Sequence, residues 1–294
     1  MNKSTETRAN VTLIGSRRAG FGTFMLLLIL TPLLLSACGA KPTDSAASQA
    51  AGGQAGSGGA AEKSVTLTVS AAASLTDALT DIQNRYEAAQ PNIKLEFNFG
   101  ASGALQQQIE QGAPADLFLS ASNHNMQALL NAGLIEAEQE KDWLANTLVV
   151  VVPVGGSFSA AKIEDLVGET ARHVAIGIPD SVPAGRYAQE ALTQANLWDS
   201  LQHKLVQGKD VRQVLQYVET GNADAGFVYK TDALTSDNVQ IAFDVDPDSY
   251  SPIHYPIGIV KATKNQEAAH NFYDYLQTPE ALDILTEYGF SAAK

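Results

Sequence analysis

Hydroxyl side chains occur at two points in the first half of the chain where an expected strand is followed by an expected helix. Ser74 follows the run 65–69, and Ser102 follows the run 93–99. Ser74 also lies three residues before Asp77, the spacing of a helix N-cap and its partner. The free amides of a helix N-terminus bind anions, so two hydroxyls at two such helix starts could form an anion site. Taken singly, each serine is also typical of an ordinary capped helix.

A matching set of hydrogen-bond donors occurs in the second half. The sequence Val-Pro-Ala-Gly at 182–185 opens an expected helix, in which the amide of Ala184 stays free after the proline. Asp210 could cap the next helix and leave the amide of Val211 pointing outward. Tyr229 ends an apolar run and offers a phenol hydroxyl. Each of these features also fits a capped loop or a buried tyrosine, so only their combination favours a site.

Strands and helices alternate from residue 64 onward, which predicts an α/β fold with parallel sheets covered by helices. Apolar or alternating runs predict strands at 65–69, 93–99, 116–120, 148–152, 174–178, 225–229, 239–243 and 255–260. Helical periodicity predicts helices at 75–86, 104–111, 123–131, 184–195, 211–219, and from about 265 and 279. In such sheets ligands bind at the carboxyl ends of strands, where the donors described above lie.

Two lobes suit this pattern better than one sheet, because the apolar strands 148–152 and 257–260 could carry the chain between two halves. The first lobe is expected to comprise residues 64–147 and 261–294. The second is expected to comprise residues 148–260. The donors of the two lobes would then face each other across a cleft.

The N-terminal segment has the features of an export signal. Cationic residues precede the apolar run 24–35, which is too short to span a bilayer. The sequence Leu-Ser-Ala-Cys at 35–38 resembles the bacterial lipobox, in which the cysteine is lipidated and the signal is cut just before it. Residues 1–37 are therefore the expected signal peptide and Cys38, the one cysteine, the expected lipid attachment site. An ordinary signal followed by a chance cysteine is the alternative.

Residues 39–63 are Gly, Ala and Ser with almost no apolar bulk, a composition typical of a flexible tether. As a random coil it would span on the order of 25–30 Å. The folded part is therefore expected outside the cell. Cys38 would anchor it to the outer face of the cytoplasmic membrane or to a periplasmic membrane face.

The chain is strongly acidic. Loss of residues 1–37 removes four cations and one anion, which changes the formal net charge from −13 to −16. This charge argues against nucleic acid or an anionic lipid surface as the ligand. A bound anion would have to be held by short-range dipoles. Because the five histidines are scattered and neither serine lies in a nucleophile elbow, we expect neither an enzyme nor a metal bound directly by side chains.

Several motifs, taken together, resemble those of the molybdate-binding proteins of bacterial uptake systems. They are Ala71-Ala-Ala-Ser-Leu-Thr-Asp-Ala-Leu79, Ser102-Gly-Ala-Leu105, Gln111-Gly-Ala-Pro-Ala-Asp-Leu-Phe118, Val182-Pro-Ala-Gly185, Asp210-Val-Arg212, Gly226-Phe-Val-Tyr229 and Phe272-Tyr-Asp-Tyr275. The resemblance extends in order from Val65 to Phe290. It implies a two-lobed type II periplasmic-binding-protein fold, with a mainly parallel sheet flanked by helices in each lobe.

The resemblance also implies a ligand, a set of binding residues and a partner. The ligand would be molybdate, and tungstate as well, held as an oxyanion in the cleft without any cofactor. The residues carried over by motif are Ser74, Ser102, Ala184, Val211 and Tyr229. The protein is expected to be a monomer that delivers its ligand to the permease of an ABC transporter and, through the permease, to its ATPase.

Other oxyanions are the main alternative, since the same scaffold could bind sulfate, thiosulfate or a small organic anion. An organic acid would call for a cationic clamp, which only Arg186 and Arg212 are placed to offer. Arg186 and Lys230 depart from the residues expected beside these motifs. Each is interpreted as a solvated side chain, with a charge near the mouth of the cleft as the alternative.

Overall fold

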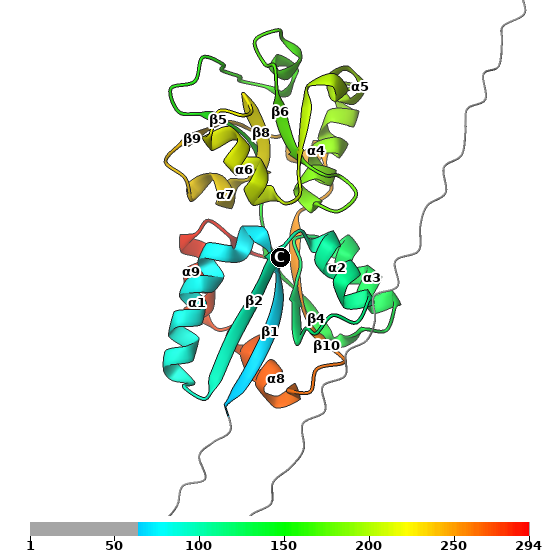
Figure 1. Cartoon of the computed structure of the whole chain (residues 1–294), viewed down its shortest axis with the longest axis vertical. Helices are drawn as coiled ribbons and strands as arrows, with labels where there is room; N and C mark the ends of the chain where they lie inside the picture. The colour runs from blue at the N-terminus through cyan, green and yellow to red at the C-terminus, as the bar shows by residue number, and fades with distance from the viewer. Residues whose placement is uncertain (1–63, 294) are drawn as a thin grey trace, which may run out of the picture. The chain divides into compact units, whose positions relative to one another are not determined.

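The computed structural model describes residues 64–293, which fall within one compact unit of the chain (Figure 1). The predicted signal peptide at 1–37, Cys38 and the predicted tether at 39–63 lie outside the described residues. Two sheets form the unit. In the described part of the chain, none of the helices is long and apolar enough to cross a membrane.

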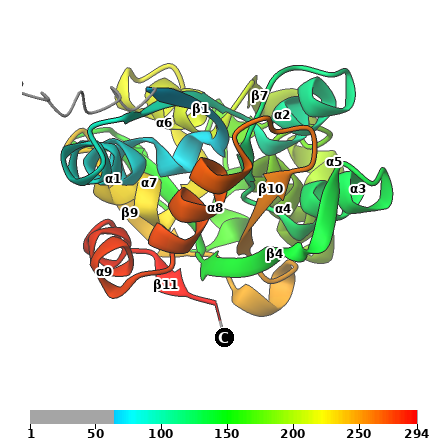
Figure 2. The same ribbon diagram turned by 90° about the horizontal axis from the view of Figure 1, so that it is seen from below.

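The first sheet has six strands in the order β11-β4-β10-β3-β1-β2. They are β1 (Val65–Ala72), β2 (Ile93–Gly100), β3 (Leu117–Leu119), β4 (Ile135–Ala145), β10 (His254–Val260) and β11 (Ser291–Ala292). Its helices are α1 (Thr76–Ala89), α2 (Ser102–Glu110), α3 (Asn123–Asn131), α8 (Gln266–Tyr275) and α9 (Pro279–Glu287). Helices α1 and α9 lie on one side of this sheet, and α2 and α3 lie on the other (Figure 2).

The second sheet has five strands in the order β7-β6-β8-β5-β9. They are β5 (Leu148–Pro153), β6 (Val174–Gly177), β7 (Leu205–Gly208), β8 (Ala225–Tyr229) and β9 (Val239–Asp244). Its helices are α4 (Pro183–Gln194), α5 (Trp198–Leu201), α6 (Val211–Glu219) and α7 (Lys230–Leu234). The described residues also form short 3₁₀ turns: η1 (Ala73–Leu75), η2 (Ile163–Val167), η3 (Gln202–Lys204) and η4 (Pro247–Ser249).

Both sheets are mixed, whereas the sequence predicted mainly parallel ones. β1 runs parallel to β2 and β3, and β6 runs parallel to β7 and β8. β10 runs antiparallel to β3 and β4, and β5 runs antiparallel to β8 and β9. β5 and β10 are the strands by which the chain enters each half from the other half. They are therefore not joined to their neighbours by the helical crossover that makes strands parallel.

Strand β10 belongs wholly to the first sheet, where Ile257 pairs with Leu119 and Tyr255 pairs with Leu144. The predicted crossing at 257–260 is therefore wrong. Residues 254–260 were expected in the second half, but they belong to the first. The chain instead returns between β9 and β10. An apolar run buried on both faces shows that a strand is central, but it does not show to which sheet the strand belongs.

Helix α1 shows how the sequence pattern becomes packing. Its buried residues are Ala78, Leu79, Ile82 and Tyr86, the apolar stripe predicted at helical spacing. The opposite face is polar and partly exposed. The stripe holds α1 against its sheet and so fixes the position of the start of the helix. Ser74 lies just before this start.

Candidate functional site

The five residues predicted to bind a ligand line one cavity. Ser74 and Ser102 reach it from the first half, and Ala184, Val211 and Tyr229 reach it from the second half. The cavity is narrow in this structure, with a volume of about 10 Å³. None of the five residues is more than 4% exposed. The structure therefore brings the two sets of donors together in a space that is nearly closed to solvent.

The register of β1 and β2 places the two serines side by side. These parallel strands pair from Val65 with Ile93 to Ala72 with Gly100. Ser74 and Ser102 each follow the last of these pairs by two residues. Carboxyl ends of paired parallel strands lie at the same edge of a sheet, so both serines reach the same end of the cavity.

Two helix starts bring amides from the second half. Helix α4 begins at Pro183, and the side chain of Asp210 caps α6 by accepting a 2.8 Å hydrogen bond from the amide of Gln213. Both features agree with the sequence prediction. Within the described residues, the amides of Ala184 and Val211 have no hydrogen-bond acceptor. They are among the first amides of their helices, which have no partner inside the helix, and so they can donate to a ligand.

Neither serine caps its helix, so the N-cap prediction from the spacing of Ser74 and Asp77 is wrong. A 3₁₀ turn follows β1, so that α1 begins only at Thr76 with Leu75 as its N-cap residue. Ser102 is itself the first residue of α2. The two hydroxyl groups are therefore free for other hydrogen bonds.

The Ser102 hydroxyl is oriented by its neighbour. Its Oγ accepts a 2.9 Å hydrogen bond from the amide of Ala121. A backbone amide can only donate, so the proton on Ser102 Oγ remains available to an acceptor in the cavity. The Ser102 amide has no acceptor among residues 64–293 either.

Tyr229 presents an unpaired hydroxyl at the same cavity. The residue is 1% exposed, and its Oη atom has no hydrogen-bond partner in the described part of the chain. Leaving a buried hydroxyl unpaired costs about 1–3 kcal/mol, which a ligand in the cavity could recover. Burial raises the pKa of Tyr229 well above its ordinary value, so the phenol is a donor at neutral pH.

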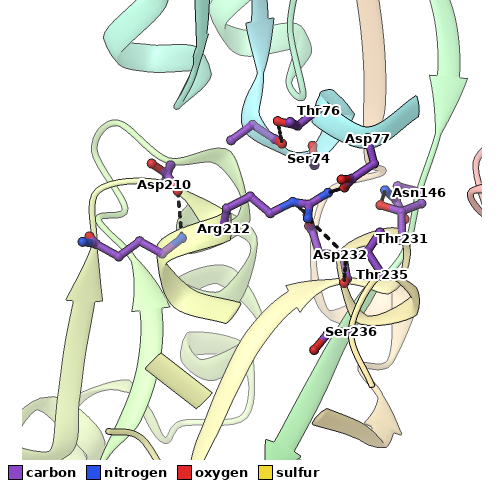
Figure 3. Close-up of polar contacts among 12 residues, drawn as sticks. Ser74, Thr76, Asp77, Asn146, Asp210, Arg212, Thr231, Asp232, Thr235 and Ser236 are labelled. Atoms are coloured by element: carbon purple, nitrogen blue, oxygen red, sulfur yellow. Dashed lines mark hydrogen bonds and ion pairs between the residues drawn. The ribbon is translucent and has the colours of Figure 1, made fainter. Parts of the chain in front are cut away.

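Among the described residues that line the cavity, none is charged. Arg212 follows Val211, but its guanidinium points to two carboxylates instead, as Figure 3 shows. Its Nε lies 2.7 Å from Oδ1 of the fully buried Asp232, and its Nη2 contacts Asp77 on α1. Burial raises the pKa of Asp232 to about 6, and the Arg212 charge opposes this shift. The charge of Arg212 is thus balanced by the two carboxylates, and the side chain does not form a clamp for an organic acid.

Arg186 and Lys230, the two cations that depart from the expected motifs, also lie outside the cavity lining. Lys230 Nζ lies 3.8 Å from Oδ1 of Asp244, and both side chains are substantially exposed. Arg186 lies half-buried on α4. Burial, together with the charge of Arg186, lowers the pKa of His124 on α3. Both cations are placed as peripheral side chains.

Polar contacts join the two halves around the cavity. The amide of Gly103 donates a 3.0 Å hydrogen bond to the carbonyl oxygen of Ser181. Arg212 of the second half pairs with Asp77 of the first. Asn146 Nδ2 donates to Thr231 Oγ1 at 2.9 Å. These contacts stabilise the closed arrangement of the cavity.

Sequence reasoning missed the polar groups behind the cavity wall. Tyr255, at 0% exposure, lies with its Oη 2.9 Å from Ser74 Oγ, and Asn146 contacts the same phenol. Neither residue lies in a recognisable motif, and each is far along the chain from Ser74. No local signal could have found them.

The comparison with known proteins gives the family. The profile of the family "Bacterial extracellular solute-binding protein" matches residues 67–291. The chain belongs to this family. YvgL of Bacillus subtilis (strain 168), whose name describes an ABC transporter substrate-binding lipoprotein, is 50% identical over 231 residues, covering 79% of this chain and 88% of YvgL. The molybdate-binding protein ModA of Haemophilus influenzae is 41% identical over 232 residues, covering 78% of this chain and 91% of ModA.

Solved structures of solute-binding proteins show the same fold. The periplasmic molybdate-binding protein of Azotobacter vinelandii aligns with a TM-score of 0.71 and 25% identity, covering 78% of this chain and all of that one. The predicted two-lobed type II periplasmic-binding fold of the α/β class is thereby confirmed. The family is one of extracellular solute-binding proteins and is not a class of enzymes.

Proposed function

We propose that the protein binds molybdate, and also tungstate, in this cavity and delivers it to the permease of an ABC transporter. One observation carries the proposal: the cavity is lined by neutral hydrogen-bond donors from both halves, and no cation among the described residues lines it. The relatives named for molybdate binding support the same ligand.

Neutral donors are sufficient for a tetrahedral dianion. The donors would be the hydroxyl and amide of Ser74 and of Ser102, the amides of Ala184 and Val211, and the phenol of Tyr229. Hydrogen bonds to a charged partner contribute about 1.5–3 kcal/mol each. Several of them together can offset the loss of the anion's hydration. The helix N-termini at Ala184 and Val211 add a favourable field.

The same donors select among oxyanions. A protonated oxygen of a ligand such as hydrogen phosphate would face a donor and find no acceptor. Molybdate carries no proton at neutral pH and is larger than sulfate, so protonation state and size both favour it. Molybdate and tungstate are close in size and would be bound alike.

Export and membrane attachment complete the proposed role. Cys38 would carry the lipid, and the Gly, Ala and Ser segment at 39–63 would allow a monomer to reach the permease at the membrane surface. The lipoprotein name of the Bacillus relative supports this arrangement. The permease, driven by its ATPase, would then take the ligand from the closed protein.

Thermal unfolding with four anions tests the ligand. The chain without its signal segment would be melted with molybdate, tungstate, sulfate and phosphate at equal ionic strength. A ligand at about 1,000 times its dissociation constant adds roughly 4 kcal/mol, a shift of several degrees. We expect that shift with molybdate and tungstate alone, and a smaller one in Ser102→Ala. Small and equal shifts with all four anions would show that the ligand is a different one.

A further inference from the structure

Behind Ser74 lies a chain of hydrogen bonds that does not itself touch the cavity. Ser74 Oγ is 2.9 Å from Tyr255 Oη, and Asn146 Nδ2 donates to Tyr255 Oη at 3.3 Å. Tyr255 comes from β10, and Asn146 lies in the connection between β4 and β5. Neither residue lines the cavity.

The direction of this chain is fixed at its far end. The backbone amide of Thr147, which can only donate, bonds to Asn146 Oδ1 at 2.9 Å. The carboxamide of Asn146 must therefore present its Nδ2 hydrogens to the other side, where they reach Tyr255 and Thr231. Figure 3 shows Asn146 beside Thr231.

The bond from Asn146 favours one direction for the hydrogen bond between the two hydroxyls. Either oxygen of the Ser74–Tyr255 pair can donate. Because Tyr255 Oη already accepts from Asn146, we assign its proton to Ser74 Oγ. Burial raises the pKa of Tyr255 well above its ordinary value, so that proton stays in place at neutral pH. With this assignment Ser74 Oγ accepts from Tyr255, and its own proton is left for the cavity.

We infer that Tyr255 and Asn146 are positioning residues that lock the Ser74 hydroxyl as a donor and so exclude ligands with a proton on the facing oxygen. The inference rests on the proposed function and explains part of its selectivity. Ser102 is locked in the same sense by a different group, the amide of Ala121. The two serines thus become donors by independent means, and only one of them depends on side chains that can be substituted.

The test is Tyr255→Phe, which removes the hydroxyl and keeps the ring. That ring packs edge-on against Tyr229 and Phe290, with centroids 5.7 and 5.3 Å away. In the variant, Ser74 can either donate or accept. Binding of molybdate, sulfate and phosphate at pH 7 would be measured by calorimetry and, for weak binding, by thermal shift at millimolar anion. Sulfate carries no proton and therefore controls for size and charge.

We expect molybdate and sulfate to lose affinity by a similar factor, up to about tenfold. Phosphate should lose none or gain, so the ratio of molybdate to phosphate affinity should fall by about as much. Asn146→Ala should shift the ratio in the same direction by less. An equal loss for all three anions, or phosphate binding that stays undetectable while molybdate weakens, would overturn the inference.

Tyr250→Phe is the matched control. Tyr250 is also a buried tyrosine, and its hydroxyl accepts a 3.1 Å hydrogen bond from the amide of Leu148, away from Ser74. This variant should lower the unfolding temperature without changing the anion ratio, whereas a change equal to that of Tyr255→Phe would contradict the positioning role. If the wild-type protein failed to bind molybdate, the proposed function would be wrong. An unchanged ratio in Tyr255→Phe with normal wild-type binding would overturn only the inference.

Discussion

The backbone amide of Gly103 donates a 3.0 Å hydrogen bond to the carbonyl oxygen of Ser181. This contact joins the first turn of α2 in the first half to the loop before α4 in the second half. It leaves no room for a side chain, because a Cβ atom at position 103 would lie 2.6 Å from that carbonyl oxygen. The two halves therefore approach each other at backbone distance beside the cavity.

Gly103→Ala should prevent full closure of the cavity. The three heavy atoms nearest to the added Cβ all belong to Ser181 in the other half, so the substitution should disturb the contact between the halves more than the packing of α2. We expect molybdate affinity to fall by about tenfold or more, since donors from one half move out of hydrogen-bond reach. The unfolding temperature without ligand should change little. Calorimetric titration and thermal unfolding would measure the two quantities.

Gly185→Ala is the contrasting variant for that experiment. A Cβ atom at Gly185 would lie 2.0 Å from the carbonyl oxygen of Gly177, within the second half itself. This substitution should therefore destabilise the protein even without ligand. Unchanged affinity in Gly103→Ala would show that the contact with Ser181 is not needed for binding.

Tyr229→Phe should change affinity and stability in opposite directions. The Tyr229 hydroxyl is buried without a partner among the described residues, so its removal should leave the ligand-free protein as stable or slightly more stable. Molybdate would lose a hydrogen bond to a charged partner, which corresponds to about 10-fold to 100-fold in affinity. Tyr273→Phe on α8, remote from the cavity, is the control. A loss of stability together with unchanged affinity would assign Tyr229 to the core alone.

The two carboxylate partners of Arg212 should contribute to different properties, Asp77 to closure of the cavity and Asp232 to the stability of the fold. Asp77 lies in the other half and is partly exposed, so Asp77→Asn should weaken closure and lower molybdate affinity only a few-fold. Asp232 is fully buried. Arg212→Ala would leave it without its partner and should destabilise the fold by about 3–5 kcal/mol. Urea unfolding and calorimetry of both variants would test this division, and equal loss of stability in both would contradict it.

Molybdate affinity should stay constant as the pH rises toward the alkaline range. The Tyr229 phenol must be protonated to donate, and burial raises its pKa well above the ordinary tyrosine value. A rise in pH through about 10, where an exposed tyrosine titrates, should therefore not remove its proton. Affinities measured from about pH 7 to pH 10 should agree within about twofold, provided that the protein stays folded. A fall that begins below pH 10, and that is absent in Tyr229→Phe, would show that the phenol titrates normally.

The sequence by itself determined the local parts of the candidate site. Ser74, Ser102, Ala184, Val211 and Tyr229 could be found because each lies next to a strand end or helix start, and such ends have short-range signals. Pro183 at the start of α4 and the Asp210 cap of α6 were predicted for the same reason. These features depend on neighbours a few residues away, so the sequence around them is sufficient.

Some features depend on which element becomes the neighbour, and only the tertiary structure decided those. The charged sequence of Ile135–Ala145 was not predicted to be a strand, yet it forms β4 because β10 and β11 pair with it. The Ser74 hydroxyl acquires its role from Tyr255, 181 positions further along the chain. A hydroxyl can donate or accept with nearly equal ease. The donor character of the two serine hydroxyls was therefore set by the partners that folding brought together, which no short-range pattern records.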